Sequence, residues 1–245
     1  MDHTNNSCCC GEAEYFSGCL ICGAPITYRA ESSIQTCSIC HKEQLTNAVC
    51  ENGHFICDAC HSYGTYAPVI TTLRDSTEKD ALLLLEKIME LPSVHMHGPE
   101  HHAIVPCVLL TAFRNNGEHM DYDAALSEIC KRAKQVPGGT CGYWGVCGAA
   151  AGAGIFMSVM TGSGPLHKDA WPFPQKLVSV ILSKLADVGG PRCCKRTSRI
   201  AIEEAIRFYR QFSYVKIPLS SVLCKYFEDN KECIREDCPY YPVNK

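Results

Sequence analysis

Apolar residues beyond residue 77 recur every three to four positions, and this spacing predicts a succession of amphipathic helices. In the segment 78–91, Ala81, Leu84, Leu85 and Ile88 form one apolar stripe, and Pro92 follows as a stop signal. The same spacing predicts helices over 98–113, 121–136, 146–160, 173–190 and 198–212. Because no run here alternates like a strand, we expect a mainly α domain over residues 77–245.

Individual residues refine these helices. Pro106 predicts a kink, and Thr197 or Ser198 is the expected N-cap of the last helix. Gly148 and Gly152 are four residues apart, which lets two backbones approach closely. The segment 135–166 has no Asp, Glu, Lys or Arg, but its apolar part is shorter than the ~20 residues that span a bilayer. We therefore expect a buried helix and no membrane association.

The pattern is different before residue 77. Residues 1–16 are polar and patternless, which predicts a disordered tail in which Cys8–Cys10 have no fixed role. Residues 66–76 are interpreted as a linker. Residues 17–65 have few aliphatic side chains and could not fold on their own apolar core.

The segment 17–65 instead supplies metal ligands in pairs. Two CxxC loops can complete a tetrahedron of thiolates around zinc. The spacing predicts a structural zinc domain with two ions, or with one complete and one partial site, and it leaves sequential and interleaved pairing open. The ligand pairs are Cys19 and Cys22, Cys37 and Cys40, Cys50 and His54, and Cys57 and Cys60.

Charge and cysteine content narrow the function classes. The N-terminus has no basic start followed by an apolar run, so we expect no export and a cytoplasmic, reducing environment for the 19 cysteines. Metal or redox chemistry explains them better there than disulfides do. The net charge is −3, and the zinc segment has only Arg29 and Lys42 as cations, so a protein contact is favoured over nucleic acid.

Three groups of residues in the helical domain are candidates for catalysis or metal binding. Glu100, His101 and His102 fall in a predicted first helical turn, which favours a site over ordinary core histidines. Cys141 and Cys147 flank a Gly-Tyr-Trp-Gly turn and are interpreted equally well as ligands or as small buried residues.

The third group is the cysteine pair Cys193 and Cys194, which lies between Arg192 and Lys195. Cations and a helix start favour thiolates, so we expect a redox pair or cluster ligands that converge with Cys141 or Cys147. The tail adds three cysteines, the last followed by proline, as is common at iron–sulfur ligands. A fourth ligand would come from Cys193, Cys194 or Cys147; the tail cysteines are Cys224, Cys233 and Cys238.

The motifs His97–His102 (HGPEHH), Cys141–Gly148 (CGYWGVCG) and Gly190–Arg196 (GPRCCKR) together resemble an uncharacterised prokaryotic family, a domain of unknown function frequent in anaerobes. The resemblance covers about residues 17–243 and implies no known reaction. More distantly, Cys147–Gly152 is similar to the centre of a small helical redox-active family named for its C-GCAxxG-C-C pattern. In that resemblance Cys107, Cys194 and Cys224 correspond to the other cysteines.

These observations predict a cytoplasmic metal-binding protein with zinc and a redox or sulfur-handling thiol site, with an iron–sulfur cluster as one form of that site. Arg192 and Lys195 would hold thiolates or an anionic small-molecule substrate, and Glu100 with His101 would move protons. A redox partner or another protein partner is expected. The alternative is a non-catalytic adaptor in which zinc sites and a helical platform dock a partner enzyme. Electron or sulfur transfer is assigned to Cys141, Cys147, Cys193 and Cys194.

Overall fold

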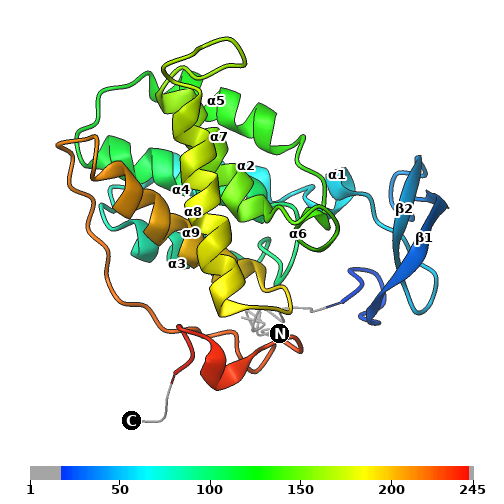
Figure 1. Ribbon diagram of the computed structural model, residues 1–245. Coiled ribbons are helices and arrows are strands. Elements are labelled where there is room, and N and C mark those ends of the chain that lie inside the picture. The colour runs from blue at the N-terminus through cyan, green and yellow to red at the C-terminus, as the bar shows by residue number, and fades with distance from the viewer. Residues whose placement is uncertain (1–17, 243–245) are drawn as a thin grey trace, which may run out of the picture.

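The computed structural model describes residues 18–242, so the predicted tail with Cys8–Cys10 lies outside the described residues. A two-stranded hairpin lies beside a bundle of helices, and a C-terminal segment runs along one end of the bundle (Figure 1). The predicted mainly helical fold is confirmed. The elements are β1 (Ile26–Thr36), β2 (Glu43–Cys50), α1 (Asp58–His61), α2 (Tyr66–Asp75), α3 (Ala81–Met89), α4 (His101–Asn115), α5 (Tyr122–Ala133), α6 (Thr140–Tyr143), α7 (Gly148–Met160), α8 (Pro172–Val188), α9 (Cys194–Tyr209) and the 3-10 turn η1 (Arg235–Asp237).

The hairpin has very little apolar core. β1 pairs antiparallel with β2 from Ile26 opposite Cys50 to Thr36 opposite Glu43, with an irregularity between Tyr28 and Ser33. Most of its side chains face solvent. The buried cluster consists of two cysteines and two apolar residues, which is too little to hold a fold without metal ions; its members are Cys37, Val49, Phe55 and Cys57.

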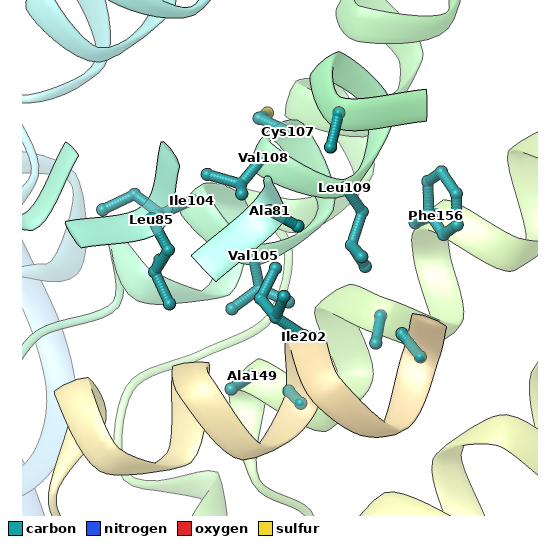
Figure 2. Packing of buried hydrophobic residues seen from close by; sticks show 14 of the residues in the cluster. Ala81, Leu85, Ile104, Val105, Cys107, Val108, Leu109, Ala149, Phe156 and Ile202 are labelled. Carbon is teal, nitrogen blue, oxygen red and sulfur yellow. The ribbon is translucent and has the colours of Figure 1, made fainter. Parts of the chain in front are cut away.

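The helical core forms around α4. Every residue of α4 from His101 to Phe113 is buried, as expected for a helix surrounded by others. It contacts α2, α3, α5, α7 and α9. Figure 2 shows its side chains beside Leu85 of α3, Phe156 of α7 and Ile202 of α9. Pro106 lies inside α4, as predicted.

Glycines let α7 approach α4 closely, as the small-residue spacing predicted. A Cβ on Gly152 would lie 2.5 Å from the backbone oxygen of His102 and 2.9 Å from Pro106. A Cβ on Gly148 would lie 2.1 Å from the His102 ring. The two helices can therefore pack at this distance only with glycine at these positions.

Two boundary predictions were wrong. The expected linker 66–76 is mostly helix α2, because Val69 and Leu73 give it a buried face against α3 and α4. The last long helix begins at Cys194 instead of near Ser198. Its N-cap is Cys193, whose sulfur accepts the Arg196 N–H at 3.4 Å and replaces the expected hydroxyl cap.

The hairpin together with α1, residues 18–61, is called the hairpin module below. This module contacts the helical bundle through a few specific interactions. Asp58, in the first turn of α1, accepts a hydrogen bond from the Gly138 N–H at 2.7 Å. The rings of Tyr28 and Tyr143 lie 6.0 Å apart, and the Arg192 guanidinium lies over the Tyr28 ring. Among the described residues, no helix is both long and apolar enough to cross a bilayer.

Candidate metal sites

The first four-ligand group forms where the chain enters β1 and leaves β2. The ligand atoms of Cys19, Cys22, Cys50 and His54 all lie within 4.8 Å of one another. Cys22 Sγ lies 3.9 Å from Cys50 Sγ and 3.3 Å from His54 Nδ1. Tetrahedral bonds of about 2.3 Å to sulfur and about 2.0 Å to nitrogen give ligand separations of roughly 3.5–3.8 Å. The group therefore has the spacing of a tetrahedral metal site.

Hydrogen bonds prepare these sulfurs for metal binding. The Ile21 N–H donates to Cys19 Sγ at 3.4 Å, and the His54 N–H donates to Cys50 Sγ at 3.2 Å. The Ala24 N–H and the Asn52 amide lower the pKa of Cys22 to about 6. Because metals bind thiolates and not thiols, these donors favour the ligand form.

The second group consists of four cysteines. The sulfurs of Cys37, Cys40, Cys57 and Cys60 all lie within 4.8 Å of one another, and Cys40 Sγ is 3.7 Å from Cys57 Sγ. The Cys57 N–H donates to Cys37 Sγ at 3.4 Å. All eight predicted ligands therefore form two groups that can hold metal, and the pairing is interleaved: the first ligand pair joins the third, and the second joins the fourth.

A third group lies at the junction of the hairpin module and the helices. One ligand atom each of His61, His95 and Glu100 lie within 4.8 Å of one another. Glu100 is fully buried, whereas the two imidazoles are partly exposed. His61 ends α1, and Glu100 is the N-cap of α4.

The structure places the predicted site residues His101 and His102 in the core. His101 donates from Nε2 to the His95 carbonyl at 3.1 Å, and burial lowers its pKa to about 3. His102 donates from Nδ1 to the Val136 carbonyl at 3.0 Å, and burial lowers its pKa as well. Both rings are therefore neutral at pH 7 and hold other groups in place, which argues against the predicted proton transfer by His101.

The structure places Cys194 near Cys147, and Cys147 near Cys141, since the thiols of each pair interact electrostatically. The sulfurs of Cys193 and Cys194 share none of the three candidate metal groups of the described residues with Cys141 or Cys147. Burial raises the pKa of Cys194 to about 12 although the Gly98 N–H and the Arg192 charge lower it, and this disfavours the predicted low-pKa thiolate. Cys147 is the N-cap of α7, and burial raises its pKa too. Cys141 is exposed.

Cys193 instead faces the C-terminal segment. It lines a small cavity together with all three tail cysteines. No three of these four sulfurs lie within 4.8 Å of one another, so they are too far apart for one ion, whereas cluster ligands are more widely separated. The four cysteines of this cavity, called the four-cysteine cavity below, are Cys193, Cys224, Cys233 and Cys238.

Backbone and amide groups donate to the sulfurs of this cavity. Cys193 Sγ accepts from the Arg196 N–H and from Asn230 Nδ2 at 3.4 and 3.5 Å. Cys224 Sγ accepts from the Tyr226 N–H, and Cys233 Sγ accepts from the Arg235 N–H, each at 3.4 Å. These donors favour negative charge on sulfur, whereas burial opposes it and raises the pKa of the Cys193 and Cys238 thiols.

Three cationic side chains line the same cavity: Lys195, Arg196 and Arg199. Arg199 makes a two-point ion pair with Glu86, at 2.6 and 2.8 Å. Its remaining nitrogen, Nη1, is buried without a hydrogen-bond partner among the described residues. Lys195 is buried, and its ammonium lies 4.0 Å from the centre of the Tyr226 ring.

Comparison with protein families identifies the helical part. A profile described as a family of unknown function, DUF5714, matches residues 69–241. The chain belongs to this family. The match begins within α2, so the DUF5714 region includes the four-cysteine cavity, His95 and Glu100 but not the hairpin module. The predicted resemblance to a family of unknown function is confirmed. No curated protein and no solved structure matched the chain.

Sequence reasoning missed His61, which lies outside the DUF5714 region and next to the predicted ligand Cys60. It also assigned no role to His95. The position of His61 directly after the predicted ligand Cys60 could have indicated a second role for it, because metal binding by Cys60 would fix the direction of the neighbouring imidazole. Its partners are more than thirty residues away in the chain, so spacing alone could not pair them.

Proposed function

We propose that the protein is a redox metalloprotein whose DUF5714 region holds an iron–sulfur cluster in the four-cysteine cavity. The hairpin module would be held by two zinc ions and would be structural. The observation that carries the proposal is the convergence of Cys193 with the three tail cysteines in one cavity lined by buried cations. The reducing cytoplasm is the compartment in which such thiols stay available.

The chemistry of the cavity, and not its volume of only about 10 Å³, favours a cluster over a single ion, so cluster binding would require the C-terminal segment to move outward. The spacing of the sulfurs exceeds that of ligands sharing one metal, while the three groups elsewhere are compact. A cluster with four thiolates carries negative charge, which Lys195, Arg196 and Arg199 would balance. The buried Nη1 of Arg199 would gain an acceptor in a cluster or ligand sulfur, and this would remove the cost of an unsatisfied buried donor.

Within this proposal, each residue type has a defined role. The N–H groups of Arg196, Tyr226 and Arg235 stabilise the reduced form by donating to sulfur. When bound, a cluster would supply one-electron transfer between a reduced carrier and an oxidised acceptor. No proton transfer by His101 is required.

Anaerobic purification followed by iron and acid-labile sulfide analysis tests the proposal. We expect iron and sulfide in comparable amounts, and an electron paramagnetic resonance signal after reduction with dithionite. Cys224→Ser and Cys238→Ser should each lose most of the iron, whereas the control Cys141→Ser, at an exposed cysteine, should retain it. A protein that contains zinc but neither iron nor sulfide, or iron lost with Cys141→Ser alone, would contradict the proposal.

An adaptor is the second candidate, supported by an exposed aromatic pair. Tyr143 and Trp144 are 55% and 67% exposed and lie where the bundle meets the hairpin module. Exposed large aromatics are typical of protein contact sites. This candidate predicts that Trp144→Ala releases a stoichiometric protein partner that Cys238→Ser still binds. Recovery of no partner from either protein would remove it.

A further inference from the structure

We propose that His61, His95 and Glu100 bind one divalent transition-metal ion and leave a coordination position open to water or another exogenous donor. His95 Nδ1 lies 3.0 Å from Glu100 Oε1, and His61 Nδ1 lies 3.3 Å from Glu100 Oε2. Ligands bonded at about 2.0–2.2 Å in a tetrahedral site are roughly 3.4 Å apart. The three side chains therefore converge at the spacing that a metal ion requires.

Two buried atoms of this group have no other partner. His61 Nδ1 and Glu100 Oε2 face each other but lack hydrogen-bond geometry, and neither has a hydrogen-bond partner among the described residues. The Glu100 side chain is 0% exposed. A buried carboxylate oxygen without a donor is costly, and a metal cation would satisfy both atoms at once.

Neighbouring residues hold the three ligands in position. The Cys57 and Cys60 ligands fix α1, and Asp58 of the same helix bonds the Gly138 N–H, so His61 is directed toward the bundle. His101 holds the His95 carbonyl from Nε2. A Cβ on Gly98 would lie 2.1 Å from Glu100 Oε2, so glycine there leaves room for the carboxylate. Such supporting contacts are typical of metal sites.

The donor set indicates the class of metal and the open position. Two imidazoles and one carboxylate suit zinc or ferrous iron. Three protein ligands are one fewer than a closed tetrahedral site needs, so one coordination position would remain for an exogenous donor. The bound ion would act as a Lewis acid on that donor.

This site is independent of the iron–sulfur proposal. The two share no ligand, and His61 comes from the hairpin module, outside the DUF5714 region. Metal binding would therefore connect the hairpin module to the N-terminal end of α4 in the DUF5714 region. If the four-cysteine cavity holds no iron, this inference is unaffected. If the three-ligand site binds no metal, the iron–sulfur proposal is unaffected.

Cobalt titration of the full-length protein loaded with only two zinc ions per chain, one for each four-ligand group, tests the inference. We expect one additional Co²⁺ to bind, with weak visible absorption and without the thiolate-to-cobalt charge-transfer band of a cysteine site. His95→Ala should lower the Co²⁺ affinity more than about 100-fold, because even loss of a group that only supports a ligand costs 10–100-fold. The matched control His119→Ala, at an exposed histidine, should leave the affinity unchanged.

Azide tests the open position, since it should change the cobalt spectrum of the wild type by direct coordination. X-ray absorption at the cobalt edge, which needs no variant, should show only nitrogen and oxygen ligands. Binding of no additional ion, equal affinity in His95→Ala with zinc content and helicity retained, or sulfur ligands at the cobalt edge would overturn the site. An unchanged spectrum with azide would overturn the open position.

Discussion

Cys193 and Cys194 are adjacent in the chain, but their sulfurs face different surroundings. Cys193 Sγ accepts hydrogen bonds from the Arg196 N–H and Asn230 in the four-cysteine cavity. Cys194 Sγ accepts from the Gly98 N–H, on the side of Glu100. The change of direction occurs because Cys193 is the extended N-cap of α9 and Cys194 is its first helical residue.

The first prediction separates these two thiols. Because only Cys193 lines the four-cysteine cavity, Cys193→Ser should lower the iron content of the anaerobically purified protein by more than half, and Cys194→Ser should not. Iron and sulfide analysis of both variants, with circular dichroism as a folding check, makes the comparison. Equal losses in the two variants would show that the pair acts as a unit.

The second prediction concerns metal removal. The hairpin module has almost no apolar core, so chelation of the metal ions proposed for its two four-ligand groups should unfold residues 19–61. Helix α4 is buried on all sides and should stay folded. Hydrogen exchange measured by mass spectrometry should show fast exchange of β1 and β2 amides and continued protection of α4. Protected hairpin amides in the metal-free protein would refute a structural role for the metals.

The third prediction concerns the buried ion pair between Glu86 and Arg199. Arg199 is fully buried and donates two hydrogen bonds to Glu86. Glu86→Gln would leave a buried guanidinium without its counter-charge, so the free energy of unfolding should fall by about 3–5 kcal/mol. The control pair is Glu128 and Arg132, one turn apart on α5 and partly exposed, where Glu128→Gln should leave the free energy of unfolding nearly unchanged. Denaturant unfolding measures both.

The fourth prediction tests the close approach of α4 and α7. An Ala at position 152 would clash with the His102 carbonyl, which is backbone and cannot rotate away. Gly152→Ala should therefore destabilise the protein by about 1–3 kcal/mol, even though alanine is the better helix former. Gly142→Ala is the control because nothing lies within 4 Å of its added Cβ and its φ is not positive. A thermal melt in which Gly152→Ala is the more stable variant would rule out this packing.

The predictions that rested on local spacing of residues agree best with the structure. Helical periodicity located α3, α4, α5, α7, α8 and α9 to within a few residues, and paired ligands located both four-ligand groups. The boundary near Ser198 failed because hydroxyl caps are the usual signal and here Cys193 is the cap. Helix α2 was missed because two buried residues, Val69 and Leu73, are too few for a clear stripe.

Long-range arrangement could not be read from the chain. The direction in which each of two adjacent cysteines points depends on the turn before α9, and no spacing rule predicts it. The convergence of His61 with Glu100 depends on how the hairpin module packs on the bundle. Glu100, which the sequence indicated as a site residue, belongs to a candidate metal group, but its expected partner His101 lies in the core and is not part of that group.

The chain order of the four-cysteine cavity has a consequence for biosynthesis. Cys193 lies at the start of α9, and the other three cysteines follow within a segment that ends at Cys238. During translation the bundle from α2 to α9 leaves the ribosome before that segment does. Insertion of the proposed cluster into this cavity would therefore be confined to a late stage of maturation, when the bundle is already available as a scaffold.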